Sequence, residues 1–95
     1  MDEGRNKGFL VDKSGSASTS SSQIATANAY RKYLFIQNLD TTNKIFVNFG
    51  SAATLTSSIQ LSPGEKFILD VYIDTQSVNV ISNAGAPVFC AKEGS

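Results

Sequence analysis

Two segments decide the fold of this chain: Tyr30-Arg-Lys-Tyr-Leu-Phe-Ile-Gln-Asn-Leu-Asp40 and, after one turn, Lys44-Ile-Phe-Val-Asn-Phe-Gly50. Both are rich in the β-branched and aromatic residues that fit a pleated, half-buried surface, and their apolar residues alternate with period two. One face of the two predicted strands carries Leu34, Ile36, Ile45, Val47 and Phe49. Asp and Asn in residues 40–43 are typical of a turn, so the two segments predict an antiparallel hairpin.

The opposite face of each strand is apolar as well, with Tyr33 and Phe35 on the first segment and Phe46 on the second. A sheet with apolar residues on both faces usually buries both, against its own core or against another subunit. We therefore predict that side chains of these second faces, together with three from later strands, form a subunit interface. The residues of this predicted interface are Tyr33, Phe35, Phe46, Ile68, Tyr72 and Phe89.

Strand-like segments separated by turns continue to the C-terminus. Ser62-Pro-Gly-Glu65 is the clearest turn, because Pro presets φ at its second position and Gly supplies the positive φ of a type II turn at its third. The other predicted strands cover residues 23–26, 59–61, 66–73, 78–80 and 88–92. With no helical periodicity, this pattern predicts an all-β fold: a small antiparallel β-sandwich, jelly-roll-like or barrel-like, preceded by an extended N-terminal arm.

Composition divides the chain into a Ser-rich arm or linker over residues 1–29 and a β-sandwich domain over residues 30–95. Residues 14–22 have the composition of a flexible Ser/Gly linker, which buries too little apolar area to offset the entropy of ordering. The alternative is an extended arm laid on a neighbouring subunit. In that interpretation the apolar triplet Phe9, Leu10 and Val11 docks beyond the arm, since three such side chains are poorly suited to solvent.

Charge and length bound the class of protein. The 95 residues make one domain with a thin core, for which oligomerisation would be a natural supplement. Eight Lys and Arg residues balance eight Asp and Glu residues, giving a formal net charge of zero. This balance argues against nucleic-acid binding, which normally uses a basic surface to neutralise phosphates. A neutral chain also lacks the charge repulsion that keeps copies apart.

The cysteine content and the start of the chain bear on its location. Cys90 is the single cysteine, so no internal disulfide is expected, and its place in a predicted strand favours a buried, small apolar role. No apolar segment typical of a signal peptide follows Met1, and no apolar run is long enough to span a membrane. We expect synthesis in the cytoplasm and no membrane partner.

The sequence offers little catalytic chemistry. It contains no histidine, which excludes Ser-His-Asp and Cys-His arrangements, and no metal-ligand spacing is present. The carboxylates Asp40, Glu65 and Asp74 fall in predicted turns, where capping is their usual role. Asp70 falls within a predicted strand, so it either pairs with Arg31 or Lys32 when buried in an oligomer or protects a solvated strand from aggregation. We expect no enzyme activity, no cofactor and no metal.

Several segments resemble a group of small proteins encoded by tailed bacteriophages. They are Tyr30-Arg-Lys-Tyr-Leu-Phe-Ile-Gln-Asn, Ile45-Phe-Val-Asn-Phe-Gly, Ile59-Gln-Leu-Ser-Pro-Gly-Glu, Val78-Asn-Val-Ile-Ser and Ala84-Gly-Ala-Pro-Val. The resemblance covers about residues 28 to 93 and implies a virion component, namely a head decoration (cement) or head-fibre subunit that is commonly oligomeric. No catalytic residue is implied.

We therefore expect a non-enzymatic structural virion protein that forms a homo-oligomer, with a trimer favoured, and binds the major capsid protein or another virion protein. Phe9, Leu10 and Val11 would anchor it to the capsid. Two alternatives stay open. One is a receptor- or glycan-binding knob of a tail fibre, whose tip would be the loops 40–43, 50–53 and 83–86. The other is a component of the head–tail connector.

Overall fold

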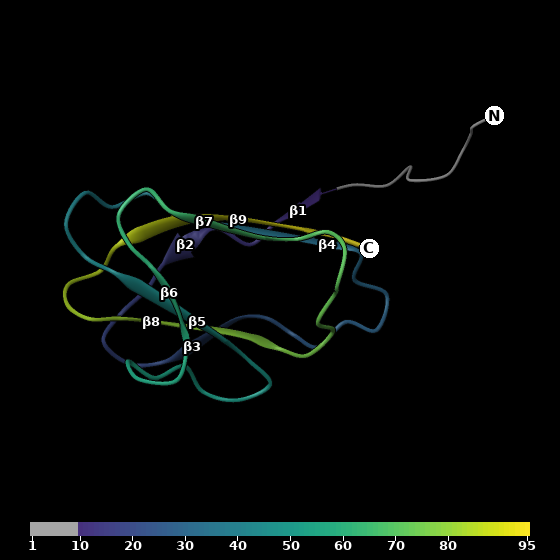
Figure 1. Ribbon diagram of the computed structural model, residues 1–95, viewed down its shortest axis with the longest axis horizontal. Coiled ribbons are helices and arrows are strands. Elements are labelled where there is room, and N and C mark those ends of the chain that lie inside the picture. Colours follow the sequence, from purple (N-terminus) through teal and green to yellow (C-terminus); the bar gives the residue numbers. More distant parts are fainter. Residues whose placement is uncertain (1–9) are drawn as a thin grey trace.

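The computed structural model describes residues 10–95, which form nine strands and contain no helix (Figure 1). The strands are β1 Leu10–Asp12, β2 Gly15–Ser16, β3 Ser22–Ala25, β4 Tyr33–Asn38, β5 Ile45–Phe49, β6 Ile59–Leu61, β7 Lys66–Leu69, β8 Val78–Ser82 and β9 Val88–Gly94. They make two antiparallel sheets, which confirms the predicted all-β sandwich. Within these residues, nothing helical is long and apolar enough to cross a membrane.

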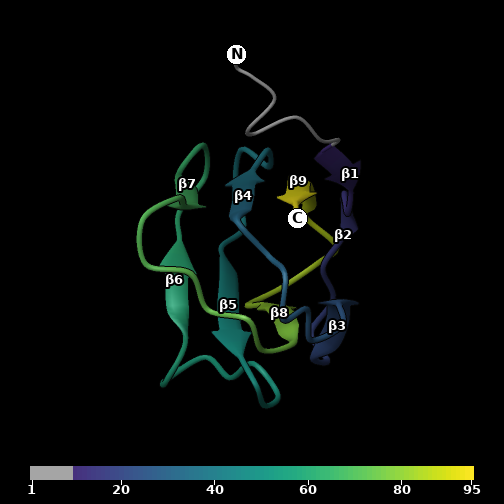
Figure 2. The ribbon, with the colours of Figure 1, turned by 90° about the vertical axis from the view of Figure 1, so that its right-hand side faces the viewer.

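The two sheets form separate layers (Figure 2). The five-stranded sheet has the order β1-β9-β4-β7, and β2 also pairs with β9. The four-stranded sheet has the order β3-β8-β5-β6. All pairs are antiparallel, as expected for strands that carry one core-facing and one outward-facing side.

The strand pairing is nested along the chain. If β1 and β2 are taken as one interrupted strand, the first strand pairs with the last, and β3 pairs with β8, the last but one. The inner pairs are β4 with β7 and β5 with β6. This arrangement of eight strands in two sheets is the double-sheet jelly roll. It agrees with the jelly-roll-like form of the predicted sandwich.

The core lies between the two sheets. Its buried cluster contains Ala17, Ala25, Leu34, Ile36, Ile45, Val47, Leu61, Val78, Val80, Phe89 and Ala91. The alternating residues that the two segments 30–40 and 44–50 were expected to bury are all in this cluster or, like Phe49, pack against it. The predicted hairpin between these segments is wrong, because β4 lies in the five-stranded sheet and β5 in the four-stranded sheet. Turn residues 40–43 therefore connect two sheets that face each other across the core, and not two paired strands. Each fully buried large apolar side chain contributes about 1.5–3 kcal/mol relative to its exposed state.

The turns follow their residue chemistry. The Glu65 N–H donates to the Ser62 carbonyl at 2.9 Å, and Gly64 has a φ of 84°, so residues 62–65 form the predicted turn with glycine in the left-handed region. The Asp40 carboxylate accepts hydrogen bonds from the N–H groups of Thr42, at 3.0 Å, and Asn43, at 2.6 Å. It caps the turn between β4 and β5.

Residues 10–25 belong to the sandwich rather than to an arm that precedes it. Here β1 and β2 pair with β9, and β3 pairs with β8. Ala17 and Ala25 lie in the core, and the Ala17 N–H donates to the Pro87 carbonyl at 2.9 Å. The sandwich therefore already includes residues 10–29, which were expected to lie outside it. Ser-rich composition suggested a linker, but short side chains and backbone hydrogen bonds suffice to add edge strands to an existing sheet.

Candidate interaction surface

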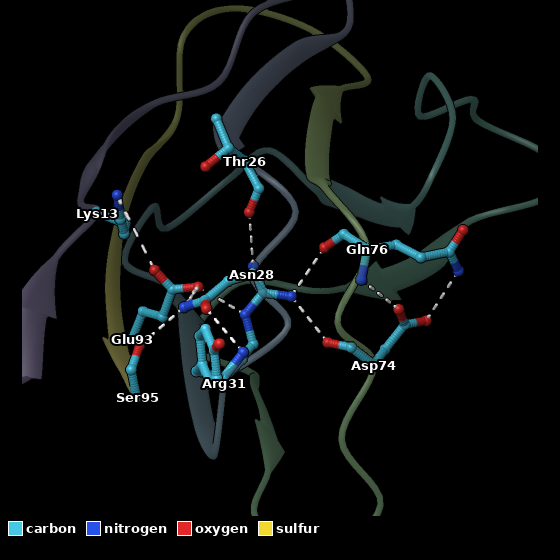
Figure 3. Close-up of polar contacts among 9 residues, drawn as sticks. Lys13, Thr26, Asn28, Arg31, Asp74, Gln76, Glu93 and Ser95 are labelled. Carbon is cyan, nitrogen blue, oxygen red and sulfur yellow. Dashed lines mark hydrogen bonds and ion pairs between the residues drawn. The ribbon is translucent and has the colours of Figure 1, made fainter.

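Arg31 is a buried arginine that joins three segments at the end of the sandwich where β9 finishes, called here the C-terminal end (Figure 3). The side chain is only 3% exposed. Its Nε donates to Glu93 Oε2 at 2.6 Å, and its Nη1 donates to the carbonyl oxygens of Asp74 at 2.7 Å and Gln76 at 2.8 Å. Its Nη2 donates to the Thr26 carbonyl at 3.0 Å. The planar guanidinium thus links the loop 26–32, the loop 70–77 and strand β9.

Glu93, the carboxylate partner of Arg31, is also buried and takes part in a wider network. The Asn28 side chain donates to Glu93 Oε2 at 3.4 Å and to Ser95 Oγ at 2.8 Å. Lys13 Nζ lies 4.0 Å from Glu93 Oε1. The buried charges therefore compensate each other. Arg31 pairs with Glu93 within its own chain, so of the two residues considered as partners for a buried Asp70 only Lys32 remains.

Large apolar side chains are exposed at the same end. In the two loops that Arg31 joins, the exposed fraction is 78% for Tyr30, 90% for Val71 and 84% for Tyr72. Leu10 and Val11, at the start of β1, are exposed beside the end of β9. These five residues, half of the ten exposed large apolar residues of the described chain, are called here the end surface. Figure 1 shows both loops and the C-terminus at this end.

The outer face of the five-stranded sheet extends this apolar surface. Leu10 and Tyr33 lie opposite Gly94 on its two sides, and a Cβ on Gly94 would be 3.3 Å from atoms of both side chains. The missing side chain therefore lets Leu10 and Tyr33 close over β9. In a neighbouring row of the sheet, Phe35 lies beside the exposed Ile68. Tyr33 and Phe35 are half-buried in the single chain.

Four of the six residues predicted for a subunit interface are thus at least partly accessible: Tyr33, Phe35 and Ile68 on the outer face of the five-stranded sheet, and Tyr72 in the loop that follows β7. The structure corrects the placement of the other two. Phe89 is 1% exposed and belongs to the core between the sheets. Phe46 lies between the core residues Ile45 and Val47 in β5, so its side chain is on the face of the four-stranded sheet that points away from the core. It is nevertheless only 6% exposed, because other residues of its own chain cover this face.

The covering of the four-stranded sheet starts from two asparagines that lie opposite each other in β5 and β8. The Asn48 side chain donates to the Ala52 carbonyl at 3.1 Å, and the Asn79 side chain donates to the Ser51 carbonyl at 2.8 Å. These bonds hold the loop 50–58 back against its own sheet. Ala53 in this loop is buried outside the main core cluster, as is Phe46.

The predicted anchor Phe9, Leu10 and Val11 is described only in part, because Phe9 lies outside the described residues. Leu10 and Val11 lie in β1, where they pair with Gly94 and Glu93. They are exposed, but they belong to an edge strand of the sandwich and not to a detached tether.

Asp12 is an ionised group on the same outer face. Its carboxylate accepts a hydrogen bond from the Ser14 N–H at 3.1 Å and from Lys92 Nζ at 3.2 Å. Hydrogen bonding by Ser14, first from its side chain and then from its backbone, together with Lys92, lowers the pKa of Asp12 from 3.8 to about 2. At the opposite end, the N–H groups of Asn43 and Thr42 lower the pKa of Asp40.

The loops of the tail-fibre alternative do not share one tip. Loops 40–43 and 83–86 are adjacent, since the Lys44 N–H donates to Asn83 Oδ1 at 2.9 Å. Loop 50–53 starts at the other end of the sandwich, where the Gly50 N–H donates to the Ser77 carbonyl at 2.9 Å.

Within residues 10–95, no three His, Cys, Asp or Glu side chains gather as they would around a metal ion. Cys90 is partly buried and carries a free thiol.

The Arg31 network was not predicted from the sequence. The sequence signal that could have revealed it is Glu93. In β9, residues 89, 91 and 93 lie on the same face of the strand, so Glu93 faces inward with Phe89 and Ala91. A charge at an inward-facing strand position requires a partner.

The chain matches no protein-family model, no curated protein and no solved structure.

Proposed function

We propose that this chain is a non-enzymatic, self-associating structural subunit of a tailed-phage virion, a decoration (cement) or head-fibre protein that binds the capsid. The observation that carries the proposal is the end surface, where Tyr30, Val71 and Tyr72 expose almost their whole side chains on a neutral chain. Exposed apolar clusters on a small soluble domain mark interaction sites.

Two further observations support a virion role. The segments over residues 28–93 resemble small phage virion proteins, and the nested strand order is the jelly roll, an architecture common in viral capsid and lectin domains. A fold alone does not fix a function, so the argument for assembly depends on the exposed surface rather than on the architecture. Copies repeated on a lattice would strengthen individually weak contacts through multivalency.

Burial of the end surface would contribute favourable energy to association. Full burial of a large apolar side chain contributes about 1.5–3 kcal/mol. Burial of Tyr30, Val71 and Tyr72 in one interface would therefore contribute several kcal/mol before the costs of association and ordering are subtracted. Leu10 and Val11, which border these residues through β1, would enlarge the same interface.

Self-association is tested by the solution mass of the purified chain, measured by light scattering on a sizing column. We expect a discrete closed oligomer for the natural chain and a folded monomer for the double variant Val71→Ser, Tyr72→Ser. The matched control is Leu39→Ser with Val88→Ser, two exposed residues at the opposite end of the sandwich, which should leave the mass unchanged. A monomeric natural chain would overturn self-association.

The virion role needs a separate test. Antibodies raised against the purified chain would be used to label gradient-purified particles from the phage that encodes it. Label on the head supports the proposal, whereas label on the tail would favour the fibre or connector alternatives. Absence of the chain from the particles, checked by mass spectrometry of their proteins, would overturn a structural virion role.

A further inference from the structure

Two exposed charges of opposite sign border the end surface. Lys32 follows the loop residues Tyr30 and Arg31, and Asp70 directly precedes Val71. Among residues 10–95, neither side chain forms an ion pair, whereas the other charges at this end do or are held by hydrogen bonds. Asp74, for example, accepts hydrogen bonds from the Gln76 backbone and side chain.

The two charges lie just beyond the ends of two neighbouring strands, β4 and β7. Leu34 in β4 lies opposite Leu69, the last residue of β7, and Asp70 directly follows Leu69. Lys32 directly precedes β4, and its N–H donates to the Gly94 carbonyl at 2.8 Å. The end surface therefore carries one positive and one negative charge beside its exposed apolar side chains.

A surface with one charge of each sign beside an apolar centre is complementary to itself. A symmetry axis through the end surface brings Lys32 of one copy towards the Asp70 of another, whether the axis is two-fold or three-fold. A partner of uniform charge would gain one of these contacts and lose the other. The formal net charge of zero adds no repulsion between copies.

We propose that the end surface binds the end surface of a second copy, with Lys32 of each protomer paired with Asp70 of the partner subunit and Tyr30, Val71 and Tyr72 packed around the axis. This inference rests on the self-association in the proposed function and identifies the surface and the charges that direct it. Charges at such a rim give specificity and orientation, while the apolar side chains supply most of the binding energy.

The test is a charge swap measured by analytical ultracentrifugation at low salt. The variant Lys32→Glu has two negative charges at the border of the end surface, and the variant Asp70→Lys has two positive charges there. Each single change should raise the dissociation constant of the oligomer about tenfold or more. A tenfold change corresponds to about 1.4 kcal/mol. The double variant with both changes restores opposite charges and should recover the natural constant within about threefold. Lys44→Glu, an exposed lysine at the opposite end, is the matched control and should have no effect.

Mixing the two single variants separates the symmetries. A two-fold dimer formed from one chain of each variant has complementary rims and should form as tightly as the natural dimer. A three-membered ring cannot alternate two kinds of subunit, so mixing should restore a trimer only in part. Both outcomes support the proposed contact and report its symmetry.

The failure of this inference differs from the failure of the proposed function. If the natural chain is an oligomer and both single variants associate as tightly as it does, the Lys32–Asp70 contact is overturned and self-association stands. If the natural chain is a monomer at all concentrations, both are overturned. Circular dichroism of each variant checks that the strands are intact, as expected for two exposed side chains that form no ion pair with residues 10–95.

Discussion

At the scale of single residues, the structure gives Asp12 an unusual titration. The carboxylate is exposed, yet Ser14 and Lys92 hold its pKa at about 2. The pKa of an exposed carboxyl group is lowered in this way when several hydrogen-bond donors favour its charged form. Its role is local, because Asp12 and Lys92 lie opposite each other where β1 joins β9. The pair therefore helps to hold the edge strand that carries Leu10 and Val11.

We predict that the Asp12 carboxyl group titrates near pH 2 in the folded chain and at a higher pH in the variant Lys92→Met with Ser14→Ala, which removes two of the donors and keeps the Ser14 N–H. Because the folded pKa is below the ordinary value of 3.8, the contribution of this group to stability is present above about pH 4 and is lost as the pH falls towards 2. Carbon-13 NMR of the side-chain carboxyl resonances measures this midpoint. An ordinary midpoint in the natural chain would contradict the contacts of Asp12.

At the scale of elements, one side chain organises the connections of the C-terminal end. Loops 26–32 and 70–77 both cross between the sheets, and the Asn28 N–H also donates to the Thr75 carbonyl at 2.8 Å. Arg31 adds hydrogen bonds to both loops and the ion pair with β9. Long connections of this kind gain a defined shape when a buried charged group satisfies their carbonyl oxygens. The exposed residues Tyr30 and Tyr72 lie in these two loops.

We predict that Arg31→Met lowers the free energy of unfolding by about 3–5 kcal/mol, because it leaves the Glu93 carboxylate and three loop carbonyls without their donor in a buried site. Lys44→Met, an exposed lysine at the opposite end of the sandwich, is the matched control and should change stability by less than about 0.5 kcal/mol. Urea unfolding followed by circular dichroism measures both. Equal midpoints for the two variants would contradict a structural role for the Arg31 network.

At the scale of the whole molecule, the nested pairing makes the first and last strands of the described chain depend on each other. β9 lies between β4 on one side and β1 and β2 on the other. Residues 10–16 therefore cover one edge of the longest strand, and Ala17 fills part of the core. The N-terminal segment is both a part of the sandwich and, through Leu10 and Val11, a part of the end surface.

We predict that a chain starting at Leu10, which keeps all nine described strands, folds, whereas a chain starting at Gln23 loses β1, β2 and the core residue Ala17 and is unfolded or strongly destabilised. Thermal unfolding of the two truncated chains and the full chain measures this difference. If the shorter chain unfolds at the same temperature as the full chain, residues 10–22 are an arm after all, as their composition suggests.

Local pattern accounts for much of the fold. Alternation in residues 33–38 and 45–49 predicted strands β4 and β5 and their core faces, and Pro63 and Gly64 predicted the turn before β7. The pattern could not decide which face of the sheet carries Phe89 or Phe46. Each has apolar neighbours before and after it, so either face could be the one that turns towards the core. Pairing of Phe89 opposite Asn38, whose side chain is itself buried, turned Phe89 inward.

The sequence by itself determined that this chain is an all-β sandwich without histidine chemistry, because strand periodicity, turn residues and composition are local properties of the chain. Only the tertiary structure decided that residues 10–25 join both sheets, that Arg31 pairs with Glu93, and that Leu10, Tyr30 and Tyr72 gather at one end. These features depend on the order in which strands pair. That order comes from backbone hydrogen bonds and packing between distant segments, which the side-chain pattern of a single segment does not specify.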